Sequence, residues 1–132
     1  MTDFSPYLAG VIVDWMSQGT DMPTAPSDIY VTIFDDTDTE RAASLTGARA
    51  AVPAGTGWTV NGTDFENTND VTLGEASTDI NNITDVALYD AETGGNQLAR
   101  YQINEAPFTV ADGSTLTFEA GQLTFDIVDT SE

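Results

Sequence analysis

Apolar and polar residues alternate along most of the chain after residue 28, and this alternation limits the fold more than any other feature. It is clearest in residues 29–34 and 123–127, where every second residue is a bulky apolar one. Because successive side chains of a strand point to opposite faces of a sheet, a period of two predicts β-strands. Turn residues recur about every eight to twelve positions, a spacing typical of antiparallel sandwiches and barrels. We therefore expect a mainly β protein, an antiparallel β-sandwich or barrel of about eight or nine short strands.

The first residues follow a different period. Ser5 and Pro6 are typical of the cap and the first turn of a helix, and Gly19 is typical of a helix end. The apolar residues between them have helical spacing and form one stripe: Tyr7, Leu8, Val11, Ile12, Trp15 and Met16. We predict one N-terminal helix whose stripe packs either on the chain's own sheet or on a neighbouring subunit.

The length of 132 residues fits a single globular domain. Within it we expect the helix in residues 1–20, a proline-containing linker in 21–27 and the sandwich in 28–132. Two segments of the sandwich carry weak signals. Residues 41–52 are rich in alanine but contain a glycine, so a helix and an irregular segment both stay open, and residues 61–70 are predicted to be a polar loop.

Charge excludes several classes of protein. The chain has 22 acidic and 3 basic residues, a net charge of −19, and all three cations are arginines, since lysine and histidine are absent. So few cations cannot neutralise phosphates, so we expect neither a nucleic-acid partner nor an anionic membrane partner. The absence of cysteine and histidine excludes zinc fingers, disulfides, haem ligation and histidine acid–base chemistry.

The acidity itself has three explanations: a basic partner, mimicry of nucleic acid, or adaptation to multimolar salt. Carboxylates are spread over the whole chain rather than gathered in one segment, and lysine is missing everywhere. Partner binding gives no reason for either feature. In concentrated salt the Debye length falls to about 3 Å, so carboxylates hydrate the surface with little mutual repulsion. We therefore predict a halophilic source.

Few residues are candidates for chemistry. Asp36, Asp38 and Glu40 alternate like the start of a calcium loop, but Arg41 stands where that loop requires glycine. We predict a solvated acidic loop, with these three carboxylates as the candidate metal ligands to check, and no cofactor. Asn61 and Asn82 each begin an Asn-x-Thr glycosylation sequon.

Catalytic groups are scarce as well. The serines lack a histidine or lysine base, the chain has no glycine-rich phosphate loop, and nothing distinguishes one carboxylate pair among the 22 acidic residues. We predict that the protein is not an enzyme.

Three segments carry a family resemblance: IYVTIFDD (29–36), ALYDAETGGNQL (87–98) and ADGSTLTFEAGQLTFDI (111–127). In this order, after an N-terminal helix and a linker, the chain resembles the small tail-fibre-like virion proteins of tailed bacteriophages. The likeness spans nearly the whole chain and rests on turn and core residues. It implies a β fold and a place in a virion. The surface without lysine differs from the bacterial pattern and indicates a tailed virus of a haloarchaeon.

Together these observations predict a virion structural protein that is made in the host cytoplasm at high salt. We expect a homo-oligomer, a trimer or a pentamer, on the particle exterior as a capsid decoration or a vertex turret. Its partners would be copies of itself and other virion proteins such as the major capsid protein. The helix stripe is the candidate subunit or capsid contact. The alternatives are a tail-fibre or baseplate component and a receptor-binding module for carbohydrate.

Overall fold

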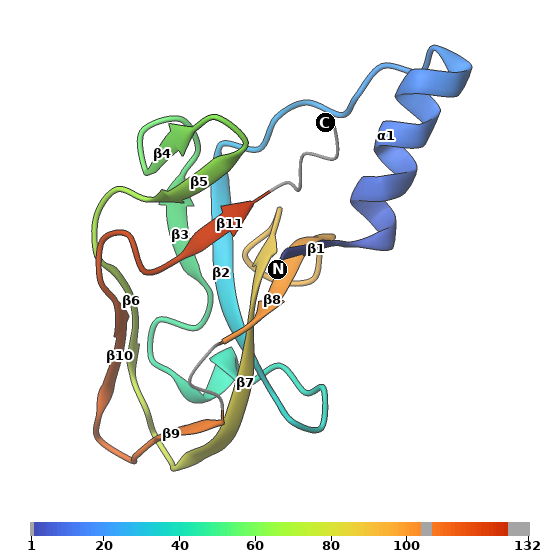
Figure 1. Cartoon of the computed structure of the whole chain (residues 1–132). Helices are drawn as coiled ribbons and strands as arrows, with labels where there is room; N and C mark the ends of the chain where they lie inside the picture. The colour runs from blue at the N-terminus through green and yellow to red at the C-terminus, as the bar shows by residue number, and fades with distance from the viewer. Residues whose placement is uncertain (1, 104–106, 127–132) are drawn as a thin grey trace.

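The computed structural model describes residues 2–103 and 107–126, and within them the chain forms one α-helix, one short 3-10 helix and eleven β-strands (Figure 1). In chain order the elements are β1 (Thr2–Phe4), α1 (Pro6–Gln18), β2 (Asp28–Asp35), η1 (Ala42–Ser44), β3 (Ala50–Pro53), β4 (Trp58–Asn61), β5 (Asp64–Asn67), β6 (Val71–Glu75), β7 (Ile80–Tyr89), β8 (Gln97–Gln102), β9 (Phe108–Val110), β10 (Thr115–Phe118) and β11 (Thr124–Asp126). The prediction of a mainly β fold with one helix near the N-terminus is confirmed.

The strands form three antiparallel sheets in the described part of the chain. The largest has the order β1-β8-β7-β2-β3, and β9 pairs with the first residues of the long strand β7. β10 pairs with β6, while β5 lies between β4 and β11. Because buried residues from all three sheets meet in one hydrophobic core, the smaller sheets cover the largest one as in a sandwich. This core includes Val31, Ile33, Leu73, Val86, Leu116 and Phe125.

β2 is an inner strand of the large sheet, flanked by β3 and β7. Val31, Thr32 and Ile33 are fully buried, as expected for a strand that is covered on both faces. The apolar side chains among them each stabilise the fold by roughly 1.5–3 kcal/mol. The hydroxyl of Thr32 donates a hydrogen bond to the carboxylate of Glu40, so its burial leaves no unsatisfied polar group.

The helix forms as its capping residues predict. The Ser5 hydroxyl accepts a hydrogen bond of 3.0 Å from the amide of Leu8, and Gly19 ends the helix in the left-handed conformation with φ of 67°. Figure 1 shows α1 projecting from the side of the sheets. No residue of α1 is buried, so the helix contributes nothing to the hydrophobic core.

Three strands were absent from the sequence prediction, and each is short. β1 precedes the helix in the sequence and pairs with β8, so residues 1–20 contain a short strand as well as the predicted helix. β3 occupies the end of the ambiguous segment 41–52, after the 3-10 helix. β5 lies in the segment 61–70, which was wrongly predicted to be a loop: Phe65 packs on the core and Asn67 is buried, whereas Asp64 is exposed.

Residues 21–27, the segment predicted to be a linker, contain no helix or strand. At the other end, the predicted last strand extends to Ile127 and the predicted domain to residue 132. Those residues, 127–132, lie outside the described part of the chain.

Candidate functional site

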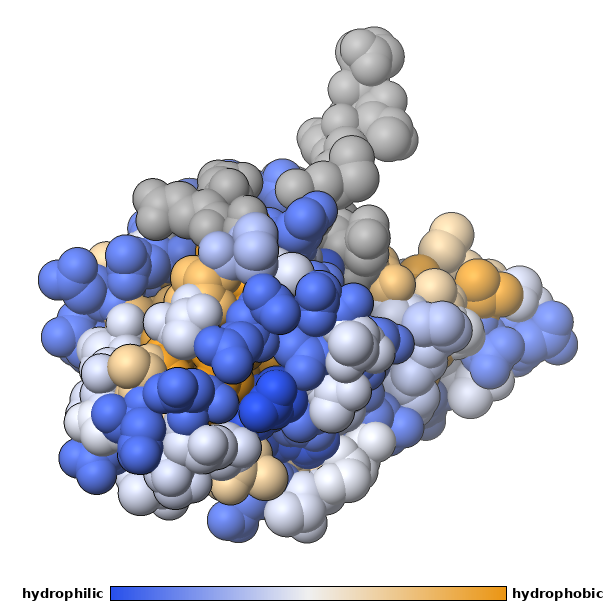
Figure 2. Space-filling model, turned by 90° about the horizontal axis from the view of Figure 1, so that it is seen from below, coloured by the Kyte–Doolittle hydropathy of each residue, from blue (hydrophilic) through white to orange (hydrophobic). Residues whose placement is uncertain are grey.

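The predicted contact stripe on α1 has two parts, the first four residues and the last two. Its first four residues are partly buried against the chain itself, and α1 has its main contacts with β8 and β1. Trp15 and Met16, in the second half, keep 55% and 73% of their surface exposed. Seen from below, the molecule is mostly hydrophilic, and hydrophobic residues are exposed on the side where α1 projects (Figure 2). The far half of the stripe therefore remains available for a contact outside this chain.

An apolar groove of about 630 Å³ lies between α1, the segment that follows it, and the β4–β5 hairpin. We call it the helix groove and define it by Leu8, Ile12, Met22, Trp58, Val60 and Phe125. Val60 and Met22 are large apolar residues with 69% and 46% of their surface exposed. Exposed apolar surface of this kind, on a chain rich in carboxylates, marks a contact site better than scattered single residues do.

Trp58 forms part of the wall of the helix groove. Its ring packs edge-on against Phe65, with centroids 5.3 Å apart, and against Phe125 at 6.2 Å. The indole Nε1 is buried and has no hydrogen-bond acceptor in the described part of the chain. Since most buried donors are paired, an unpaired indole N–H in the wall of a groove is a notable exception.

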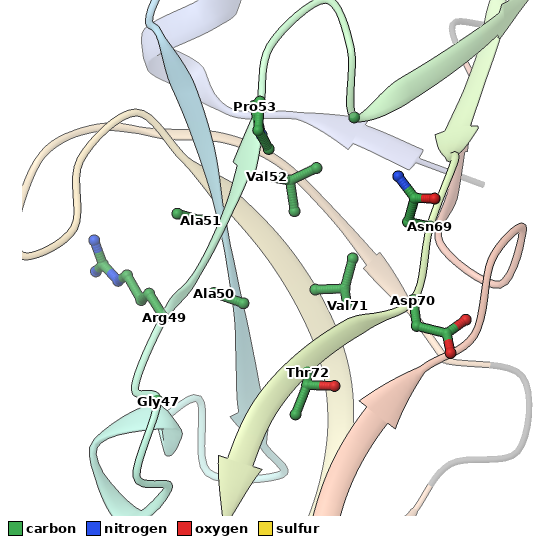
Figure 3. A pocket seen from close by; sticks show the side chains of 11 residues that line it. Gly47, Arg49, Ala50, Ala51, Val52, Pro53, Asn69, Asp70, Val71 and Thr72 are labelled. Carbon is green, nitrogen blue, oxygen red and sulfur yellow. The ribbon is translucent and has the colours of Figure 1, made fainter.

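A second cavity, of about 310 Å³, lies between the edges of β3 and β6 (Figure 3). Val52 and Val71 lie on its two sides, whereas the side chain of Arg49 points away from it. Asp70 accepts a hydrogen bond of 3.0 Å from the amide of Ala120. The two charged side chains of the lining, Arg49 and Asp70, are thus engaged in other contacts.

The acidic segment 35–40 lies away from both cavities and is held by arginines. All three arginines of the chain form ion pairs there, and we call this group the arginine cluster: Arg41 with Asp35 at 3.1 Å, Arg49 with Glu40 at 2.8 Å, and Arg100 with Asp38 at 2.6 Å and Asp85 at 2.8 Å. Residues 36–39 of this segment are exposed, whereas Asp35 is buried and Glu40 is partly buried. Asp35, Asp38 and Glu40 of this segment are each paired with an arginine, and Arg100 is 62 residues from its partner Asp38.

Arg49 is the most buried member of the arginine cluster, with 7% of its side chain exposed. Its Nε and Nη2 donate to the two carboxylate oxygens of Glu40, and Nη1 donates to the carbonyls of Ala91 at 2.9 Å and Gly94 at 2.8 Å. The guanidinium also lies 3.9 Å from the ring centre of Tyr89. One side chain thereby ties the acidic segment to the β7–β8 turn.

Hydrogen bonds strongly favour the charged form of Asp35. The Thr37 hydroxyl, at 2.7 Å, contributes most, and the amides of Thr39 and Thr37 and the side chain of Arg41 add to it. Together they lower the pKa of Asp35 from 3.8 to about 2. The hydrogen bond from Arg49 likewise lowers the pKa of Glu40.

The candidate metal ligands Asp36, Asp38 and Glu40 do not converge. Asp38 and Glu40 each face a different arginine, and the described residues contain no group of three potential ligands able to hold a metal ion. Both candidate glycosylation sites are exposed: Asn61 ends β4 beside a tight turn, and Asn82 lies in β7 with a positive φ of 58°. Among the described residues no helix has the length and apolar character needed to cross a membrane.

The family model described as "Podophage GP4 fiber I protein gp80" matches residues 3–126, nearly the whole chain. No curated protein matches the sequence. The match runs from β1 to the end of β11 and so includes α1, the helix groove and the arginine cluster.

Proposed function

We propose that this chain, which belongs to the family of the podophage GP4 fiber I protein gp80, is a self-assembling subunit on the exterior of a tailed-virus particle. Family membership makes it a phage fibre protein and hence a structural component of a virion. Self-assembly, the exterior location and the host are our proposals. No part of the described structure suggests a chemical reaction, and assembly is the function that the exposed surfaces favour.

The observation that carries the proposal is the exposed apolar end of α1. Val13, Trp15 and Met16 project into solvent from a helix that buries none of its residues. Large apolar side chains on a projecting element gain free energy when a neighbouring subunit covers them. Identical subunits that use one such contact assemble into closed symmetric rings, and a trimer or a pentamer would satisfy this rule.

The proposal has two versions, which differ in where the protein sits on the virus particle. The family description favours a tail fibre or baseplate component. A compact domain without an internal repeat favours a cap or ring, such as a capsid decoration or a vertex turret. Immunogold labelling of virions distinguishes them, because gold at the tail supports the first version and gold over the capsid supports the second.

The proposed host is a haloarchaeon, because the surface charge is negative and uncompensated. The three arginines of the chain are engaged with Asp35, Asp38, Glu40 and Asp85 in the arginine cluster, whereas the chain has 22 acidic residues. Mutual repulsion among them falls when salt shortens the Debye length to about 3 Å at 1 M. Apolar subunit contacts are also strengthened by salting-out ions.

The mass of the assembly, measured by light scattering after size exclusion at about 3 M and about 0.3 M salt, tests the proposal. We expect a discrete multimer at high salt that dissociates or unfolds at low salt. Trp15→Asp should give folded monomers at high salt, whereas Ala9→Asp, which adds the same charge to an exposed helix position off the stripe, should still assemble. A wild-type monomer at both salt concentrations would refute self-assembly.

The carbohydrate-binding alternative requires an accessible aromatic platform. Trp58 is enclosed by Phe65 and Phe125, whereas Trp15 is exposed. Glycan binding that Trp15→Ala abolishes, by a protein that stays monomeric, would favour the receptor-binding module instead.

A further inference from the structure

We propose that subunits of this protein assemble by exchanging their N-terminal arms. The arm consists of residues 2–20, which include β1 and α1, and in the described structure it lies on strand β8 of its own chain. In the assembly each chain would place its arm on β8 of the next copy, so a closed ring of copies results. This inference rests on the proposed self-assembly and specifies the contact that produces it.

The edge of β8 determines what can occupy it. β1 pairs with this edge in antiparallel register, and the amide of Ser5 donates a hydrogen bond of 3.1 Å to the carbonyl of Leu98. The helix α1 has its main contacts with β8 as well. Every copy of the chain carries the same arm and the same edge, so a neighbour's arm fits with the same register and the same hydrogen bonds. The occupant is therefore residues 2–20 of a second copy.

The arm is held loosely by its own chain. β1 pairs with β8 over only three residues, and α1 buries none of its residues and projects from the side of the sheets (Figure 1). A cavity of about 350 Å³ lies between α1, the linker and the sheets, with Val11, Pro23 and Ile29 in its lining. Leaving its own chain thus costs the arm few contacts.

The segment that joins the arm to β2 is suited to act as the hinge. Residues 21–27 contain no helix or strand, and Pro23 and Pro26 lie within them. Prolines favour an extended linker over one that folds back on itself. Seven extended residues span at most about 25 Å, enough to carry the arm to an adjacent body. Exchange then requires no rearrangement of the sheets.

The exposed end of α1 supplies the reason for the arm to leave. Because the contacts with β8 are the same in the closed and exchanged forms, a gain in free energy must come from new contacts. Val13, Trp15 and Met16 are 58%, 55% and 73% exposed in the closed form, and at the junction of two bodies they would be covered. Asp3 and Asp14 are the only acidic residues of the arm, among 22 in the chain, so the arm brings little repulsion to its neighbour.

Cysteine cross-linking distinguishes an exchanged arm from a closed one, because the chain has no cysteine of its own. Phe4 in β1 and Ala99 in β8 stand directly opposite each other, and both line the helix groove. Opposed residues of antiparallel strands have Cα atoms about 4.5–5.5 Å apart, within the range of a disulfide. A Phe4→Cys chain and a C-terminally tagged Ala99→Cys chain are mixed unfolded, refolded at about 3 M salt and oxidised with copper–phenanthroline.

We expect a covalent heterodimer of the tagged and untagged chains on a non-reducing gel. Closed arms give no such band, because neither chain then holds both cysteines at one junction. The matched control uses Thr59→Cys and Glu66→Cys chains, whose residues are opposed within the β4–β5 hairpin, and it should give no heterodimer. Equal yields of heterodimer from the two pairs would overturn the proposal.

A chain that carries both Phe4→Cys and Ala99→Cys tests the driving force. It should form covalent multimers, and the further substitution Trp15→Asp should return the arm to its own chain and give cross-linked monomers. A multimer whose cross-links all lie within single chains would overturn arm exchange but leave self-assembly standing. A wild-type protein that light scattering shows to be monomeric at both salt concentrations would refute self-assembly, and arm exchange with it.

A second pair of positions guards against damage to the arm by the loss of the Phe4 ring. Thr2→Cys and Tyr101→Cys are opposed in the same two strands, and we expect them to give the same heterodimer. No cross-link at either pair, within or between chains, would also overturn the proposal, because the arm would then not lie on β8 of any copy.

Discussion

The arginine cluster and the helix groove are opposite kinds of surface built by the same chain. In the arginine cluster each guanidinium faces a carboxylate, and Arg49 and Arg100 also lie over the rings of Tyr89 and Phe34. In the helix groove apolar side chains line a depression, and the buried indole donor of Trp58 has no acceptor among the described residues. The contrast teaches that the few cations of this chain hold its own loops in place. The exposed apolar surface lies elsewhere, at the helix groove, where another molecule could contact it.

The largest expected effect is that of Arg49→Met, which breaks the most buried ion pair. Removing the guanidinium takes away both Arg49 hydrogen bonds to Glu40, which keeps only the one from Thr32, and the side-chain donor to the carbonyls of Ala91 and Gly94. We expect a cost of about 3 kcal/mol in the free energy of unfolding. Arg41→Met is the matched control, because Arg41 makes one ion pair and is more exposed, and it should cost about 1 kcal/mol. Denaturant titration measures both. Equal losses would mean that burial in the cluster does not matter.

A second effect, of roughly 1–2 kcal/mol, should depend on pH through Asp35. Its pKa is lowered from 3.8 to about 2 in the folded state, so the charged carboxylate stabilises the fold above about pH 4. That stabilisation is lost as the pH falls through about 2, where the folded form also becomes protonated. The stability difference between wild type and Asp35→Asn should therefore shrink between about pH 4 and pH 2. A constant difference over this range would contradict the assignment.

The smallest effect is expected at the exposed end of α1. Met16→Gln keeps the length and the helix propensity of the side chain, and Met16 packs on nothing in the core, so the free energy of unfolding should change by less than about 0.5 kcal/mol. Thermal unfolding of the monomeric form at fixed salt measures this change. A loss of about 2 kcal/mol in the free energy of unfolding would show that the exposed end of α1 stabilises the fold. The contrast between a region that holds the fold together and a surface left for contacts would then fail.

Local signals in the sequence predicted the helix, its caps and the class of the fold, because each depends on neighbouring residues. Ser5, Pro6 and Gly19 act within one turn of where they stand. The short strands were harder to predict. In β5 only Phe65 and Asn67 point inward, which is too little alternation to recognise, and its pairing with β11 joins residues that are distant along the chain.

The arginine cluster was missed for a related reason. The spacing of Asp36, Asp38 and Glu40 suggested that they bind one metal ion. The partners of the arginines are instead distant along the chain: Arg49 donates to the carbonyls of residues 91 and 94, and Arg100 pairs with Asp38. The one available signal was the scarcity of cations. In a chain with three arginines, burying a positive charge next to a carboxylate is the expected use for each of them.

The attachment of α1 has a mechanical consequence. One end of the helix continues from β1, a three-residue strand at the edge of the sheet, and the other end continues through residues 21–27 into β2, which neighbouring strands hold on both sides. A force that pulls on the tip of the helix would thus be shared between two strands. β1, at the sheet edge, can be peeled away one residue pair at a time, whereas β2, inside the sheet, cannot. Peeling β1 from β8 would let α1 move away from the sheets while residues 21–27 still connect it to β2.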